Sequence, residues 1–200
     1  MLKVLYNKRM RDFEVIAFDI DGTLYPSWRL NLMIFPYALR HLKFFIHFSK
    51  VRKILHRTAP LSDFFEYQAR LLALEMNLTS EEAKAKIDAI IYNGMKPFFE
   101  KVPPFKGILE TFQKLKEAGF RLVLLSDFPP EQKGSVWGLR EYCELSLGTE
   151  MIGAMKPSKY PFGIMSMALK VPPEKILYVG NSLKFDVRGA KNAGRSEERR

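Results

Sequence analysis

The sequence predicts an α/β protein whose core is a doubly wound, parallel β-sheet with helices on both faces. In the second half of the chain, short apolar runs typical of buried strands alternate with amphipathic stretches typical of helices. Another apolar run, residues 14–20, is separated from them by a long segment of helical periodicity. Because alternating strands and helices form parallel sheets through right-handed crossovers, we expect a Rossmann-like core, residues 1–25 and 101–200, with an all-helical cap domain, residues 26–100, inserted after the first strand.

Length and composition are consistent with this prediction. The chain of 200 residues is long enough for one domain with a sizeable insertion, and 47% apolar content suffices for a packed core. A single cysteine, Cys143, excludes a disulfide framework, and charges interrupt any signal-peptide core in residues 1–18. We therefore expect a cytoplasmic protein. The net charge of +10 suits an anionic partner, but no nucleic-acid-binding motif accompanies it, so no nucleic acid is expected.

The first strand leads into a motif that can carry chemistry. The apolar run from Val15 to Phe18 is followed by Asp19-Ile20-Asp21-Gly22-Thr23-Leu24-Tyr25. Residues two apart on a strand point to the same side, so both aspartates project from the sheet edge where α/β proteins bind ligands. Two unpaired carboxylates would repel each other there, and a divalent cation would resolve that conflict. Taken alone, the same residues also fit a simple Asp-rich turn.

The predicted insertion begins with a stretch, residues 30–57, that is both apolar and basic. No uncharged run in it reaches the ~20 residues that a membrane span needs. Two interpretations fit: a cap helix packed on its neighbours, which we favour because most apolar stripes are core, or an amphipathic helix at a membrane interface. The stripe comprises Leu32, Phe35, Leu39, Leu42, Phe45, Ile46 and Ile54, and the basic residues are Arg40, Lys43, Lys50, Arg52 and Lys53.

Capping and turn signals mark the other elements. Ser62-Asp63 and Thr79-Ser80-Glu81-Glu82 each start a helix of the insertion, and Asn93-Gly94 ends the second one. Beyond the insertion, the pattern predicts a helix over 107–118, a strand over 120–125, a helix from about 131, an apolar stretch near 145–152, a helix over 158–169, a strand over 175–179 and a helix over 184–193.

Polar side chains follow three of the predicted strands. Carboxyl ends of parallel strands share one edge of the sheet, so these groups can converge. An acid pair, a hydroxyl, a lysine and a second polar and acidic cluster suit phosphoryl transfer through a carboxylate nucleophile with Mg²⁺. The residues are Asp19 and Asp21 after the first strand, Ser126 at the second, Asn181 and Asp186 after the last, and Lys156 on a loop.

Four short motifs in this order resemble those of the haloacid dehalogenase (HAD) superfamily, specifically its phosphatase-type members. The resemblance covers residues 14–25 and 103–194, and the helical insertion stands where this superfamily places its cap. Each motif is short, but their order on one alternating frame makes the signal specific. They are Asp19-Ile20-Asp21-Gly22-Thr23-Leu24-Tyr25, Leu125-Ser126-Asp127, Lys156-Pro157 and Gly180-Asn181-Ser182-Leu183-Lys184-Phe185-Asp186.

The resemblance implies a mechanism with named roles. Asp19 would attack phosphorus as the nucleophile, and Asp21 would act as general acid and then as general base. Lys156 would stabilise charge on the phosphate and the nucleophile. The implied phosphate-binding residues are Gly22, Thr23, Ser126, Asp127 and Lys156, and the implied Mg²⁺ ligands are Asp19, the backbone carbonyl of Asp21, Asn181 and Asp186.

Two features depart from the superfamily pattern. Asn181 stands where an aspartate is usual, which removes one negative charge and predicts weaker Mg²⁺ affinity. Residues 195–200, five of them charged, stand where an apolar strand normally follows. We therefore expect the last core strand to be missing and one sheet edge to be exposed. A naturally shortened member, a frameshifted end or an incomplete chain would each explain this.

The favoured function is a Mg²⁺-dependent phosphatase that acts on a small phosphorylated metabolite through an aspartyl-phosphate on Asp19. Asp21 favours a phosphatase over a dehalogenase, because an alkoxide leaving group needs a proton and a halide does not. Two alternatives are a phosphomutase and a catalytically weak binding protein. The latter would use its basic helical insertion on a membrane surface or an acidic partner; peripheral membrane contact is the less favoured of these expectations.

Overall fold

A computed structural model describes residues 12–194 and 196–199, the last four by their backbone. The core is a five-stranded sheet in the order β3-β2-β1-β4-β5, and every neighbouring pair is parallel. The predicted α/β class is thus confirmed. The strands are β1 (Val15–Phe18), β2 (Arg121–Ser126), β3 (Cys143–Gly148), β4 (Ile176–Gly180) and β5 (Ser196–Arg199). The helices are α2 (Ser27–Arg40), α3 (Leu42–Leu55), α4 (Phe64–Met76), α5 (Ser80–Ile87), α6 (Lys96–Lys101), α7 (Ile108–Glu117), α8 (Thr149–Ile152), α9 (Lys159–Leu169) and α10 (Arg188–Asn192).

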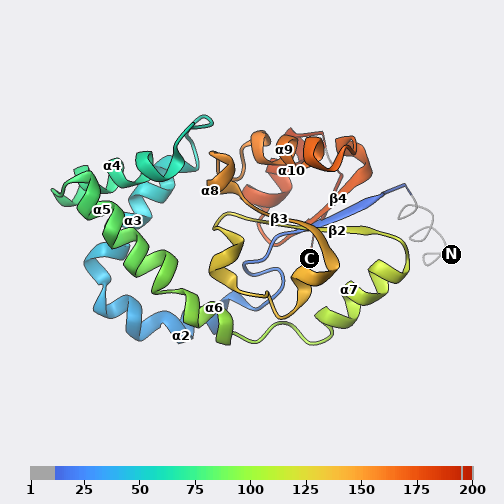
Figure 1. Ribbon diagram of the computed structural model, residues 1–200, viewed down its shortest axis with the longest axis horizontal. Coiled ribbons are helices and arrows are strands. Elements are labelled where there is room, and N and C mark those ends of the chain that lie inside the picture. Colours follow the sequence, from blue (N-terminus) through green and yellow to red (C-terminus); the bar gives the residue numbers. More distant parts are fainter. Residues whose placement is uncertain (1–11, 195, 200) are drawn as a thin grey trace.

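Side chains of β1 alternate between two separate cores. Ile16 and Phe18 belong to the cluster that includes α7, whereas Val15 and Ala17 belong to the cluster of α9 and α10. Figure 1 shows α7 on one side of the sheet and α9 and α10 on the other. All four residues of β1 are buried, because the strand has a neighbour along each edge and a helical layer over each face. This central position fixes the point at which the aspartate motif leaves the sheet.

Helices α2 to α6 follow β1 and occupy the left of Figure 1; we call residues 27–101 the helical insertion. Its predicted helix starts are present: the Asp63 side chain accepts from the Glu66 amide at 2.9 Å, and Thr79 and Glu82 form a reciprocal capping box. The division into core and cap domains at residues 26–100 stays a prediction. Within the described residues, no helix combines the length and the apolar character that crossing a membrane requires.

The stripe of α2 and α3 that we expected to pack on its neighbours lies instead at the surface, so this prediction was wrong. Its large apolar side chains Leu32, Phe35, Leu39, Leu42, Ile46 and Ile54 are exposed, and Phe45 is half-buried. The two helices pack through a second face, whose buried residues are Leu30, Phe44, Phe48, Val51 and Leu55. Both faces are apolar at helical spacing, and periodicity alone does not distinguish the one that meets the rest of the protein.

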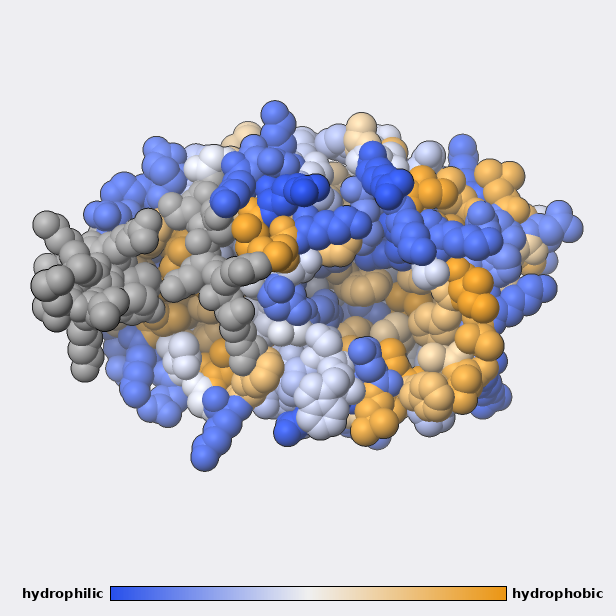
Figure 2. Space-filling model, turned by 180° about the vertical axis from the view of Figure 1, so that it is seen from behind, coloured by the Kyte–Doolittle hydropathy of each residue, from blue (hydrophilic) through white to orange (hydrophobic). Residues whose placement is uncertain are grey.

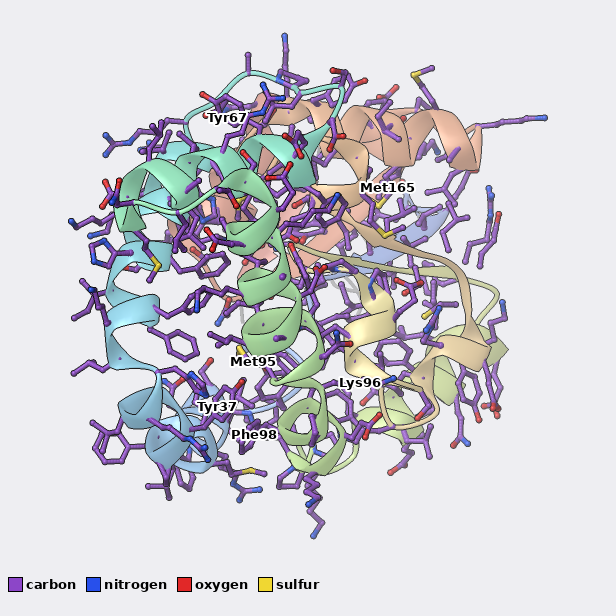
Figure 3. All side chains as sticks on the ribbon, turned by 60° about the vertical axis from the view of Figure 1, so that its left-hand side comes forward. Tyr37, Tyr67, Met95, Lys96, Phe98 and Met165 are labelled. Atoms are coloured by element: carbon purple, nitrogen blue, oxygen red, sulfur yellow. The ribbon has the colours of Figure 1, made fainter. Side chains whose placement is uncertain are left out.

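The inner face of α2 is positioned by Tyr37. Its hydroxyl donates to the carbonyl oxygen of Ile90 at 3.0 Å, and its ring packs on Phe98 with 5.4 Å between centroids, as the labelled side chains in Figure 3 show. Gly94 permits this approach, because a Cβ at that position would lie 2.0 Å from the Tyr37 hydroxyl. The contact therefore sets where α2 lies relative to the end of the insertion.

The carboxyl-terminal region differs from expectation in one strand. Ser196–Arg199 forms β5 and pairs in parallel with β4, with Ser196 opposite Leu177 and Arg199 opposite Gly180. Strand pairing uses backbone groups, and an edge strand needs only one neighbour, so a highly charged sequence can form it. The prediction that the last core strand is missing was therefore wrong.

The helix expected from about residue 131 is shorter than predicted. It is a single 3₁₀ turn, η2 (Pro130–Lys133), which ends at Gly134 with φ of 59°.

A buried ion pair joins the helical insertion to the core. Arg52 of α3 hydrogen bonds to Glu150 of α8, whose side chain is 0% exposed. The Tyr92 hydroxyl donates to the other Glu150 oxygen at 2.6 Å, and Gln68 accepts from Arg52 at 3.2 Å. Burial raises the pKa of Glu150, and the charge of Arg52 opposes that shift. Removing either charge would therefore leave the other buried without a counter-ion and would destabilise the folded protein.

We expect Glu150→Gln to lower the free energy of unfolding by about 3 kcal/mol or more, because it leaves the Arg52 charge without its counter-ion. Urea denaturation followed by circular dichroism measures this change. Glu110→Gln is the matched control, since Glu110 pairs with Lys114 on the exposed surface of α7. This substitution should leave the urea concentration at the midpoint of unfolding unchanged. Equal, small effects of the two substitutions would contradict the importance of the buried pair.

Candidate active site

The carboxyl ends of β1, β2 and β4 bring the predicted residues to one cleft of about 400 Å³. Side chains of the helical insertion, including Leu30 and Ile34 of α2, form its other wall. Thr23 and Ser126 lie behind the cleft lining, in hydrogen-bond contact with it. The predicted residues that line the cleft directly are Asp19, Asp21, Asp127, Lys156, Asn181 and Asp186.

Lys156 connects Asp19 to Asp186. Its Nζ donates to Oδ1 of each aspartate at 2.7 Å, and all three residues are at most 3% exposed. Burial alone would lower the pKa of Lys156, but the negative charges around it, Asp19 first among them, raise that pKa well above its usual value. Lys156 is therefore an ammonium ion that holds two carboxylates together.

Asp19 lies in a surplus of negative charge. Burial raises its pKa, Lys156 opposes the shift, and the charges of Asp186 and Asp21 add to it, so that the pKa reaches about 7. The Thr23 hydroxyl donates to Oδ2 of Asp19 at 3.0 Å and fixes the side chain from the other side. Asp19 lines the cleft together with Asp186, and a cation bound there would relieve the surplus of negative charge.

Asp21 is surrounded by donors. The Tyr25 hydroxyl donates to Oδ1 at 2.6 Å, and the Ser126 hydroxyl donates to Oδ2 at 3.1 Å. Nζ of Lys133 lies 2.5 Å from Oδ1 and 2.7 Å from Oδ2. Burial would raise the pKa of Asp21, but the charge and hydrogen bonds of Lys133 outweigh it and the pKa falls below its usual value. Ser126 thus connects the first two motifs, and its role in binding phosphate stays a prediction.

Lys133 is a site residue that no sequence motif predicts. Its side chain is 3% exposed, and its ammonium lies 4.0 Å from the ring centroid of Phe99, so it is enclosed between η2 and the helical insertion. A lysine three residues after Pro130 has no motif to distinguish it from an exposed loop residue. The available signal was the charge balance, because three converging carboxylates need more than one cation. That signal predicts a second buried cation without indicating which lysine or arginine supplies it.

Two other predicted residues make contacts of a different kind. Oδ1 of Asp127 accepts from the Thr149 hydroxyl at 2.7 Å and from the backbone amide of Lys156 at 3.3 Å, so Asp127 ties the Lys156 loop to the end of β2. Asn181 is exposed at the cleft, and its amide nitrogen lies against Gly22, where a Cβ would be 2.1 Å away. Gly22 also has φ of 81°, which favours glycine.

The oxygen donors in the cleft fit a hard divalent cation. Asp19 and Asp186 converge, as their shared contact with Lys156 shows, and Asn181 lines the same cleft. Among the residues with described placement, no group of three acidic, histidine or cysteine side chains is arranged to hold a metal. The ligand set that the superfamily resemblance implies adds the Asn181 amide and the Asp21 carbonyl, and this set stays a prediction. Mg²⁺ prefers such oxygen ligands.

Residues 13–194 match the haloacid dehalogenase-like hydrolase family. The chain belongs to this family. It is 26% identical over 190 residues to a glyceraldehyde 3-phosphate phosphatase from Methanopyrus kandleri, covering 90% of this chain and 81% of the relative. It is 27% identical over 188 residues to a phosphoglycolate phosphatase from Caulobacter vibrioides, covering 90% and 75%. The fold is similar to that of the HAD-hydrolase YfnB from Bacillus subtilis, with a TM-score of 0.63, 16% identity and coverage of 92% and 87%. The prediction of a HAD hydrolase of the phosphatase type is confirmed.

In this HAD-like hydrolase, Gly180 makes room for Asp186. A Cβ at position 180 would lie 2.5 Å from both Cβ and Cγ of Asp186. We expect Gly180→Ala to displace Asp186 from Lys156 and to lower the hydrolysis of p-nitrophenyl phosphate by roughly a hundredfold, because misplacement by ~1 Å has that effect in active sites.

Gly163→Ala on α9 is the control, since a Cβ there would meet no heavy atom within 4 Å. Steady-state kinetics of both purified variants make the comparison, with circular dichroism to confirm folding. Full activity of Gly180→Ala would show that Asp186 tolerates displacement.

Proposed function

We propose that this protein is a Mg²⁺-dependent phosphatase that hydrolyses a small phosphorylated metabolite through an aspartyl-phosphate on Asp19, with residues 26–100 as its cap. The observation that carries the proposal is the buried Lys156 that holds Asp19 beside Asp186 at the cleft. Relatives named for glyceraldehyde 3-phosphate and phosphoglycolate support a small substrate, and the Bacillus subtilis hydrolase is described as bound to magnesium. The proposed location is the cytoplasm, because a single cysteine suits a reducing compartment.

In the first step, an Asp19 oxygen attacks phosphorus while the bond from phosphorus to the ester oxygen breaks. Asp21 gives its proton to the leaving oxygen. The negative charge of the bound phosphate favours this protonated form, since it opposes the charge of Lys133. Bound Mg²⁺, held by Asp19, Asp186, Asn181 and the Asp21 carbonyl, would offset the repulsion between nucleophile and phosphate.

In the second step, a water molecule attacks phosphorus and the bond to Asp19 breaks. Asp21, now ionised, accepts the proton of that water, so the step returns both aspartates to their starting states and releases phosphate. Lys156 stays with Asp19 throughout and compensates the negative charge that returns to it. In the alternative phosphomutase, another acceptor would replace water, so release of free phosphate in step with the alcohol favours the phosphatase.

The first test is Asp19→Asn, which keeps the size of the side chain and removes the nucleophile. We expect loss of p-nitrophenyl phosphate hydrolysis by a factor of about a thousand or more. Wild-type turnover should stop on addition of EDTA and return with excess Mg²⁺. Asp88→Asn, an exposed aspartate outside the cleft, serves as control. Turnover that survives Asp19→Asn would overturn the mechanism.

A second test concerns Lys133, which sequence analysis missed. Lys133→Met keeps the length of the side chain and removes the charge that faces Asp21. We expect kcat to fall about a hundredfold, since general acid–base catalysis depends on the position and charge of Asp21. Lys116→Met on the exposed side of α7 is the control. An unchanged kcat in Lys133→Met would mean that Lys133 acts only in folding.

A further inference from the structure

One face of the helical insertion presents an apolar stripe to solvent. Four residues of α2 follow one another at intervals of four, three and four, and Leu42 and Ile46 continue this spacing into α3; Ile54 follows eight residues later, beyond Lys50. Monomeric proteins rarely expose contiguous apolar surface of this kind without a binding role. We call it the α2–α3 face: Trp28, Leu32, Phe35, Leu39, Leu42, Ile46 and Ile54, whose exposed fractions run from 42% to 68%.

The charge of this face has one sign. Residues 22–62 contain seven lysines and arginines and no aspartate or glutamate. Arg52 is engaged with Glu150 below the surface, and Lys50 pairs with Glu75 at 3.1 Å. The other five, all exposed and without a carboxylate partner among the described residues, are Arg29, Arg40, Lys43, Lys53 and Arg57.

The α2–α3 face is not an unfinished part of the internal core. The opposite side of the same helices already packs inward, through Leu30, Phe44 and Phe48 and through the contact of Tyr37 with Phe98. Figure 2, a view from behind, shows hydrophobic side chains gathered at the right-hand end of the molecule with hydrophilic ones around them. The apolar stripe therefore has two kinds of neighbour: a packed interior below, and cations beside it.

We infer that the α2–α3 face binds the surface of an anionic lipid bilayer. Its apolar side chains enter the boundary between headgroups and acyl chains, Trp28 lies at headgroup depth, and the five free cations contact lipid phosphates. A second copy of the chain would bring the same positive charges together, and a nucleic acid would offer phosphates but no apolar partner for the stripe. An anionic bilayer supplies both an apolar phase for the stripe and phosphates for the cations.

This inference goes beyond the proposed phosphatase and does not depend on it. Leu30 and Ile34 place the other side of α2 at the cleft, so binding would bring the cleft close to the lipid surface. The Asp19→Asn variant should bind vesicles as the wild type does. A failure of catalysis and a failure of membrane binding are therefore separable results.

Co-sedimentation of the full chain with vesicles tests the inference. We expect binding to vesicles of equimolar phosphatidylcholine and phosphatidylglycerol, at least tenfold weaker binding to phosphatidylcholine alone, and release as salt screens the charges. The chain has two tryptophans, and Trp137 is held inside by its hydrogen bond to the Val102 carbonyl at 2.8 Å. A blue shift of emission on binding should therefore come from Trp28, and Trp28→Phe should remove it.

Two substitutions separate the apolar and electrostatic contributions. Phe35→Ser and Lys43→Glu should each weaken binding to the mixed vesicles by roughly tenfold or more. Their matched controls lie outside the face: Leu74→Ser, with Leu74 83% exposed, and Lys86→Glu on α5 should bind as the wild type does.

Three results would overturn the inference. These are absence of binding to anionic vesicles at low salt, equal binding to both kinds of vesicle, and equal binding by the face variants and their controls. Dimerisation that Phe35→Ser abolishes, without vesicle binding, would assign the face to a second copy of the chain.

Discussion

Two carboxylates converge in a buried site only if a cation lies between them, and Lys156 is that cation. It contacts Asp19 from β1 and Asp186 from beyond β4, so one ammonium joins the ends of two neighbouring strands. Its backbone is fixed from two directions: the Asp127 carboxylate accepts from its amide, and His56 Nδ1 lies 2.6 Å from its carbonyl oxygen. Because His56 follows α3, the residue that balances charge in the core also contacts the helical insertion. The position of the Lys156 loop and the geometry of the cleft depend on this balance.

The parts predicted well from sequence are those that local pattern determines. Strand and helix periods differ, so the alternation from residue 107 onward defines the parallel sheet, and the residues that cap α4 and α5 satisfy the first amides of each helix as expected. Topology then explains the site, because carboxyl ends of parallel strands share an edge. Asp19, Ser126 and Asp186 meet there for that reason, although they are far apart in the chain. Their roles in catalysis stay predictions.

The features that the sequence did not reveal are those for which several residues or helix faces are equally suitable by local pattern. Both faces of α2 are apolar, and only the tertiary packing of Leu30 and Tyr37 shows which face is internal. Many lysines could have faced Asp21, and only the tertiary contacts of Lys133 with Asp21 and Phe99 identify the one that does. The strand β5 relies on backbone pairing with β4, to which its charged side chains give no clue. Each of these outcomes is decided by a distant segment of the chain.

The close approach at Gly94 makes this position intolerant of change. A Cβ there would lie 2.0 Å from the Tyr37 hydroxyl and 2.6 and 2.7 Å from the backbone oxygens of Ala89 and Ile90. A smaller residue at position 37 would remove only the first of these clashes, and it would give up the hydrogen bond to Ile90 and the contact with Phe98. Homologues that keep α2 at this place should therefore retain glycine at position 94, and that glycine would record the placement of the cleft wall in sequence alignments.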